Sequence, residues 1–227
     1  MSMATMTDTE RPVAAAVEAQ PATERRRMPS QRTLTIAAGS IVVLALVVWM
    51  FVTSGRRKED FANQALLQAR LTAEQGNLPL AATELQRIID SYRGTGAAQD
   101  AVIALNQVRL INGQSDLAAV SLREFLASNP DPKYAAPANG MLAAALENAG
   151  RPADAAAAYR RASEVATVEY LKAEYLVEAG RALKAAGDTA AAQAAYREVL
   201  TRFPNAAAVT EAKVRLAELT DGKVQPL

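Results

Sequence analysis

A glycine recurs four times along the chain at a constant interval of 37 residues, and the residues that follow it recur with it. The stretch GRPADAAAAYRRA, which begins at residue 150, is nearly repeated as GDTAAAQAAYREV from residue 187. The recurring set is Gly76, Gly113, Gly150 and Gly187, with an alanine five residues after each, Ala81, Ala118, Ala155 and Ala192. A fixed period of this length is the sequence signature of a repeat protein, so the pattern predicts a stack of similar units.

Each unit is predicted to contain two α-helices. Apolar residues at helical spacing precede each glycine, and a glycine can adopt the left-handed conformation that ends a helix. The residues suited to starting the second helix are Pro79, Pro152 and Asp188. The second helix carries an apolar stripe at helical spacing, which includes Tyr159 and Tyr196. The sequence therefore predicts an all-α fold built from helix pairs.

Helix-breaking residues mark most of the boundaries between units. Gly94 and Gly96 close the first unit, and Pro130 and Pro204 close the second and the fourth. The boundary near Thr167 is poorly marked. The predicted units are residues 61–96, 97–132, 133–167 and 168–204. A further helix at about 206–219, within a cap at 205–220, is expected to begin at Asn205 and to bury Val209, Ala212, Leu216 and Leu219.

The order of glycine, alanine, tyrosine or leucine, and closing proline resembles the tetratricopeptide repeat family over about residues 61–204. The period of 37 residues is longer than the 34 that is usual in that family. The small residue expected inside the first helices is present at Ala69, Ala143 and Gly180 but is replaced by Asn106 in the second unit. The resemblance implies a solenoid of about four degenerate repeats plus a capping helix over residues 59–221. Such solenoids bind peptides or protein segments on an extended concave surface.

In this family the concave surface lies on the first helix of each unit. The resemblance therefore implies a protein-binding face formed by Leu66, Arg70, Glu74, Ile103, Gln107, Leu110, Ala144, Glu147, Val177, Arg181 and Lys184. Family members that clamp a C-terminal carboxylate place lysine and asparagine along this surface. Leu66, Ile103 and Val177 occupy some of those places here, so that specificity is not expected.

The chain contains neither histidine nor cysteine. It therefore has no thiolate nucleophile, no disulfide, and neither the commonest general base nor the commonest metal ligand. A site made of carboxylates alone remains possible, but no cluster in the sequence indicates one. We expect no enzyme activity, no metal, no cofactor and no small-molecule substrate. The net charge of +1 also provides no field that favours nucleic acid.

Residues 33–55 form an uncharged segment of 23 residues between Arg32 and the basic run Arg56, Arg57 and Lys58. At 1.5 Å per residue, a helix of this length spans roughly 30 Å, which is the thickness of the hydrocarbon core of a bilayer. We predict one transmembrane helix over residues 33–55, after a disordered tail over residues 1–31. The alternatives are a buried core helix and a cleaved signal peptide. The length of the segment and the basic run that follows it favour an uncleaved anchor.

Basic residues near the two ends of this segment are equal in number, but the block Arg25, Arg26 and Arg27 favours a cytoplasmic N-terminus. The layout of tail, single anchor and exported repeats resembles the YfgM-like ancillary subunit of the bacterial Sec translocon. This resemblance implies a single-pass inner-membrane adaptor or chaperone whose periplasmic repeats bind translocon subunits, periplasmic chaperones or newly exported chains. Two alternatives stay open: a scaffold or self-assembling subunit of another envelope complex, and a receptor whose repeats face the cytosol.

Overall fold

The computed structural model of this chain describes residues 31–220, apart from the side chains of residues 31–39, 41, 42, 51 and 52. The predicted tail over residues 1–31 thus lies, except for its last residue, outside the described residues. Within residues 31–220 the secondary structure consists of nine α-helices. The chain divides into two compact units, Met1–Trp49 and Met50–Leu227.

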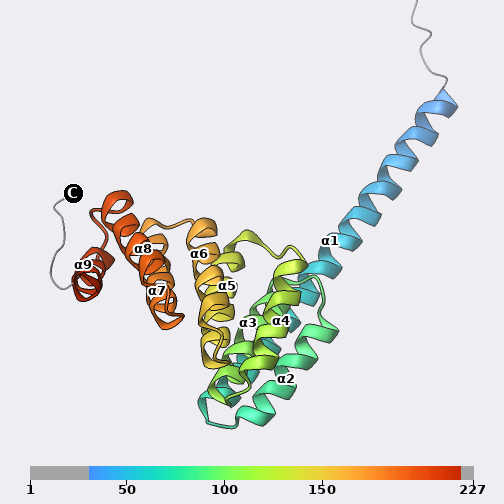
Figure 1. Cartoon of the computed structure of the whole chain (residues 1–227). Helices are drawn as coiled ribbons and strands as arrows, with labels where there is room; N and C mark the ends of the chain where they lie inside the picture. The colour runs from blue at the N-terminus through green and yellow to red at the C-terminus, as the bar shows by residue number, and fades with distance from the viewer. Residues whose placement is uncertain (1–30, 221–227) are drawn as a thin grey trace, which may run out of the picture. The chain divides into compact units, whose positions relative to one another are not determined.

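Helices that follow one another in the sequence pack side by side in the second unit (Figure 1). The helices are α1 (Gln31–Glu74), α2 (Leu78–Ser91), α3 (Gly96–Ile111), α4 (Ser115–Ala127), α5 (Pro132–Asn148), α6 (Pro152–Val165), α7 (Glu169–Ala185), α8 (Thr189–Arg202) and α9 (Ala208–Leu219). The end of α1 packs against α2, and the pairs α3–α4, α5–α6 and α7–α8 follow before α9. The boundary near Thr167 is a three-residue link between α6 and α7. The predicted all-α solenoid of helix pairs is confirmed.

The first helix, α1, is continuous over 44 residues. It therefore runs without a break through the predicted junction between the uncharged segment and the repeat domain at residues 55–59. Between residues 43 and 50 of this helix, seven large apolar side chains are exposed: Val43, Leu44, Leu46, Val47, Val48, Trp49 and Met50. Within the described residues, no helix combines the length and the apolar character that a bilayer crossing requires.

The four repeated glycines end the first helix of each pair in the same way. Each has a positive φ, between 72° and 84°, which a residue without a Cβ adopts at little cost. The N–H of Gly150 donates to the carbonyl of Glu147 at 2.9 Å, and the N–H of Arg151 donates to the carbonyl of Leu146 at 2.8 Å. The same two bonds, to the third and the fifth residue back, recur at Gly76, Gly113 and Gly187. The repeat in the sequence is therefore a repeat of one helix-ending motif.

Small residues let paired helices approach closely, and larger ones fill the space between pairs. The four repeated alanines, Ala81, Ala118, Ala155 and Ala192, are completely buried. The position four residues later holds Leu85, Leu122, Tyr159 and Tyr196, all of them buried. Asn106, where the expected small residue is missing, is buried as well. Its Nδ2 donates to the carbonyl of Val102 at 2.9 Å and to Ser121 Oγ at 3.1 Å, so its polar group is not left unpaired.

The capping helix α9 starts later than the sequence predicts. Its N-cap residue is Ala207, which makes no side-chain capping bond, so the expectation that Asn205 begins the helix is wrong. The reason is a turn after α8, in which the Ala206 N–H donates to the Phe203 carbonyl at 3.0 Å and so includes Asn205 in the turn. Of the four residues expected to be buried on this helix, Ala212 and Leu216 are buried, and Val209 and Leu219 are half-buried.

Candidate functional site

A groove between the end of α1 and α3 contains four residues of the predicted binding face. This N-terminal groove has a volume of about 390 Å³ and is lined by Arg70, Ala73, Glu74, Leu78, Leu85, Ile103, Ala104, Gln107, Val108 and Ile111. Arg70, Glu74, Ile103 and Gln107 belong to the predicted face. Ile111 is an exposed lining residue that the sequence analysis missed, although it continues the spacing of four residues from Ile103 through Gln107. Leu110 is half-buried against the core cluster that contains Leu122 and Leu142, and it does not line this groove.

The N-terminal groove has an apolar floor and a charged rim. Leu85 and Val108 are buried, whereas Glu74 is exposed. Arg70 forms an ion pair with Asp100 on α3 at 3.8 Å, with about half of each side chain exposed. An exposed pair of this kind contributes little to stability. The groove can therefore hold apolar side chains of another chain while its rim makes polar contacts, the usual division of a protein interface.

Two residues of the predicted face lie in the core. Leu66 is only 4% exposed and belongs to a core cluster with Ala62 and Ala69, which lie about one turn away on α1. Val177 is 3% exposed and packs in the C-terminal core with Tyr196. Leu66 is therefore not available to a partner. Val177 reaches the surface only as the floor of a second groove.

The charged residues of the middle of the face bind one another. Arg181 on α7 donates from Nη2 to Glu147 Oε2 on α5 at 2.8 Å and from Nε to Glu178 Oε2 at 2.7 Å. The Tyr159 hydroxyl on α6 donates to the same oxygen of Glu147 at 3.1 Å. Burial raises the pKa of Tyr159, and the Glu147 carboxylate raises it further. Lys184 similarly binds Glu218 on α9 at 3.2 Å. These predicted contact residues are thus engaged in contacts between repeats.

Partial burial lowers the pKa of Arg181, but hydrogen bonds to Glu147 and Glu178 raise it by more, so the net pKa lies above its ordinary value. The guanidinium therefore stays charged at physiological pH. Because it joins α5 to α7, it connects the third pair of helices to the fourth. Ala144, another residue of the predicted face, is half-buried and lies three residues before Glu147 on α5.

Equivalent tyrosines of the third and fourth units differ in their hydroxyl groups. The Tyr159 hydroxyl binds Glu147, whereas the buried Tyr196 hydroxyl has no hydrogen-bond partner. Tyr159→Phe is expected to lower the free energy of unfolding by about 1 kcal/mol. Tyr196→Phe is expected to leave it unchanged or to raise it, because no bond is lost and a buried polar group is removed. Urea unfolding followed by circular dichroism measures the free energy of unfolding of both variants. Equal losses would contradict the view that only the Tyr159 hydroxyl makes a hydrogen bond.

A second groove lies between α7 and α9. This C-terminal groove has a volume of about 350 Å³ and is lined by Tyr170, Glu174, Val177, Glu178, Ala207, Ala208 and Glu211. Only Val177 of these belongs to the predicted face. Tyr170 and Glu174 precede it on α7 at the spacing of about one helical turn, a pattern that could have identified them. Glu211 was missed because α9 was interpreted as a cap alone.

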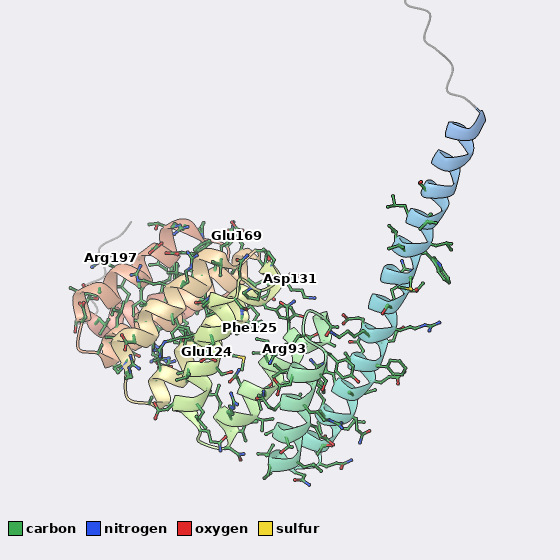
Figure 2. All side chains as sticks on the ribbon, turned by 90° about the vertical axis from the view of Figure 1, so that its right-hand side faces the viewer. Arg93, Glu124, Phe125, Asp131, Glu169 and Arg197 are labelled. Carbon is green, nitrogen blue, oxygen red and sulfur yellow. The ribbon has the colours of Figure 1, made fainter. Side chains whose placement is uncertain are left out.

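A further hollow of the repeat domain is lined by two second helices, α2 and α4, and by the first helix α3. It has a volume of about 380 Å³. Leu117 and Val120 are exposed apolar residues of its lining. Glu124 and Phe125, labelled in Figure 2, also line it, the first exposed and the second buried. Among the described residues there is no group of three or more carboxylates that could hold a metal ion.

Comparisons with known proteins agree with this geometry. The sequence profile of the tetratricopeptide repeat family matches residues 174–206, which cover most of α7, all of α8 and the turn that follows. The repeat domain has the tetratricopeptide repeat fold. No curated protein sequence matches the chain.

Solved structures show the same fold at low sequence identity. The crystal structure of MamA has a TM-score of 0.57 and 18% identity, with 71% of this chain and 82% of that chain covered. A putative kinesin light chain of Podosopora anserina with nearly identical TPR-like repeats has a TM-score of 0.57 and 16% identity, with 70% of this chain and 85% of that chain covered. A tetratricopeptide repeat protein from Parabacteroides merdae has a TM-score of 0.56 and 12% identity, with 70% of this chain and 60% of that chain covered. Tetratricopeptide folds are scaffolds for protein–protein interaction, and none of these comparisons indicates an enzyme family.

Proposed function

We propose that this protein is a membrane-anchored tetratricopeptide adaptor or chaperone of the bacterial cell envelope, ancillary to the Sec translocon. In this proposal its repeats lie in the periplasm and bind exported chains, translocon subunits or periplasmic chaperones. The observation that carries the binding role is the N-terminal groove, with its apolar floor and charged rim on the first helices of two successive repeats.

The uncharged segment at residues 33–55 supports the anchor. The exposed apolar residues from Val43 to Met50 include consecutive positions of α1, and a helix turns by about 100° per residue, so they surround the helix. A helix that is apolar on all sides needs an apolar environment on all sides. The proposed span extends beyond these described side chains and rests on the sequence of residues 33–55.

Protease treatment of intact spheroplasts tests the topology. An antibody against the C-terminus is expected to show that external protease removes the repeat domain, because the proposal places it outside the cytoplasm. Extraction of the membrane fraction at alkaline pH should leave the chain with the membrane. Full protection of the repeats until the cells are lysed would contradict export and would favour the cytosol-facing receptor.

Site-specific crosslinking tests the partner. The chain has no cysteine, so one introduced cysteine can be labelled selectively with a thiol-reactive photocrosslinker. Gln107→Cys places the crosslinker in the N-terminal groove, and Gln114→Cys places it on an exposed turn outside that groove. We expect crosslinks from Gln107→Cys to translocon subunits, exported chains or periplasmic chaperones, identified by mass spectrometry. Adding Ile103→Glu should reduce them by about tenfold, the equivalent of 1.4 kcal/mol. Equal labelling from both positions, or no change with Ile103→Glu, would contradict binding in the groove.

A self-assembling scaffold is the second candidate function. Phe61, Leu67 and Leu71 are exposed apolar residues on α1, at the start of the repeat stack. Terminal helices of a solenoid usually have a polar outer face, so these residues favour a contact with another surface. A crosslinker at Leu67→Cys that joins the chain mainly to itself, with no translocon subunit captured from Gln107→Cys, would favour this alternative.

A further inference from the structure

The hollow between α2 and α4 carries an exposed apolar pair that the third and fourth repeats lack. Leu117 and Val120 on α4 are 57% and 52% exposed, and both line this hollow. In the third unit the equivalent positions hold Asp154 and Ala157, and in the fourth unit both positions hold alanine. Large apolar side chains therefore stand on the surface of α4 where the same turn of α6 and of α8 is small or charged.

The floor of this hollow is also apolar. Leu105 is buried, and Ile89 and Val102 are half-buried around it. The ridge formed by Leu117 and Val120 thus lies directly beside a recess of about 380 Å³. One patch offers both a protruding and a receiving apolar surface, which is the requirement for a self-complementary contact between two identical chains.

Two charged side chains line the hollow, and neither has an ion-pair partner among the residues that the structure describes. Arg109 on α3 donates from Nη1 to Oδ1 of Asn106 at 3.3 Å. Glu124 on α4, labelled in Figure 2, is exposed. Partial burial lowers the pKa of Arg109, so its charge is partly desolvated with no carboxylate paired to it. The hollow therefore holds one unpaired charge of each sign.

The two charges lie at different levels along the hollow. Arg109 lies two residues before the end of α3 at Ile111, and Glu124 lies nine residues after the start of α4 at Ser115. Because a short turn joins these antiparallel helices, about 10 Å of helix length separates the two charges at 1.5 Å per residue. Val120 lies near the midpoint of that interval. A two-fold axis at this midpoint brings the level of Arg109 in one copy to the level of Glu124 in the other.

We propose that this face binds a second copy of the chain, with α4 of the two copies packed antiparallel about a two-fold axis near Val120. Leu117 and Val120 of each copy lie at the hollow of the other, and Arg109 of each copy pairs with Glu124 of the other. The contact is closed, so it makes a dimer and not a filament. Because the patch is small, we expect a weak dimer that dissociates at the low concentrations of an unfolding measurement.

Crosslinking at the two-fold axis tests this inference. A residue on such an axis meets its own equivalent, and the chain has no cysteine, so Val120→Cys should join two copies through a short bismaleimide. The measurement uses the full chain in a non-ionic detergent at about 100 μM, a concentration suited to a weak contact. The matched control is Ala157→Cys, at the exposed equivalent position on α6. On a denaturing gel, we expect at least about tenfold more dimer from Val120→Cys than from Ala157→Cys.

Exchange of the two charges tests the pairing between copies. Adding either Arg109→Glu or Glu124→Arg to Val120→Cys should lower the dimer yield by about tenfold, because like charges then face one another. In an equimolar mixture of these two variants, both pairings are again between opposite charges. The yield from the mixture should therefore return to within about twofold of that from Val120→Cys alone. This recovery also requires that both variants are folded.

Three results would overturn the inference. Equal dimer yields from Val120→Cys and Ala157→Cys would show random collision in place of a specific contact. A loss in the charge variants with no recovery in their mixture would show that the two charges do not pair between copies. Crosslinks from Val120→Cys in whole membranes that join the chain to another protein, and not to itself, would assign the hollow to that protein.

The dimer goes beyond the proposed function and is separable from it, because this hollow and the N-terminal groove share no lining residue. Envelope proteins captured from Gln107→Cys, with no dimer from Val120→Cys, would remove only the inference about α4. A dimer from Val120→Cys, with no envelope protein captured from Gln107→Cys, would instead remove the translocon role and retain the contact between copies.

Discussion

Leu122→Ala is expected to lower the free energy of unfolding of the repeat domain by about 2–5 kcal/mol. Leu122 on α4 is completely buried and packs in a core that includes Phe125, Leu142 and Leu146. Truncation removes apolar contacts and leaves a cavity that rigid neighbouring helices fill only in part. Urea unfolding followed by far-ultraviolet circular dichroism, on the full chain in a non-ionic detergent, measures the loss.

Leu117→Ala on the same helix is the matched control. Leu117 is 57% exposed, so this change should alter the free energy of unfolding by less than about 0.5 kcal/mol. The same atoms are removed in both variants, and only burial differs. Similar losses at the two positions would show that α4 does not pack through the face described above.

Gly180→Val is expected to be destabilising by at least about 2 kcal/mol, through overpacking. A Cβ at residue 180 would lie 2.5 Å from Cε1 of Tyr196, a distance that side chains do not tolerate. The Tyr196 ring is fully buried, so it has no solvent-filled space into which to move. The unfolding midpoint in urea should therefore fall strongly. The helix content of the folded chain, measured without urea, should stay the same.

Gly140→Val provides the comparison, because a Cβ there would lie 2.7 Å from Cε1 of Tyr175. Tyr175 is only half-buried, so its ring can swing outward and the cost should be smaller than at residue 180. Combining Gly180→Val with Tyr196→Leu should cost less than the sum of the two single changes, since the clashing ring is absent. Strict additivity would contradict a direct contact between residues 180 and 196.

Much of the fold could be predicted from local pattern. The glycine at 37-residue intervals requires one backbone conformation, and that conformation ends a helix whatever surrounds it. The buried alanines five residues later and the apolar stripe of each second helix follow from helical spacing alone. The prediction failed at Asn205, because a turn between two helices depends on how the chain leaves the preceding helix as well as on the capping preference of one residue.

The surroundings of the predicted binding-face residues were harder to predict. Arg70, Glu74, Ile103 and Gln107 do line a common groove, since they occupy the first helices of neighbouring repeats. Leu66 belongs to the core because side chains of α2 and α3 pack in one cluster with it. Glu147 and Arg181 are 34 residues apart in the sequence and are joined only when α5 and α7 pack together. The residue pattern of a single helix cannot predict a contact between two helices.

The sequence by itself determined the helix pairs and the position of the glycine turn inside each pair, because each such turn depends on residues within about one helical turn of one another. The uncharged segment at residues 33–55 is also a property of the sequence alone. Only the tertiary structure decided that α1 continues without a break into the first repeat, which charged residues neutralise one another, and that Glu174 and Glu211 meet across one groove. These features depend on the angle and spacing between helices, which are set by the packing of many side chains at once.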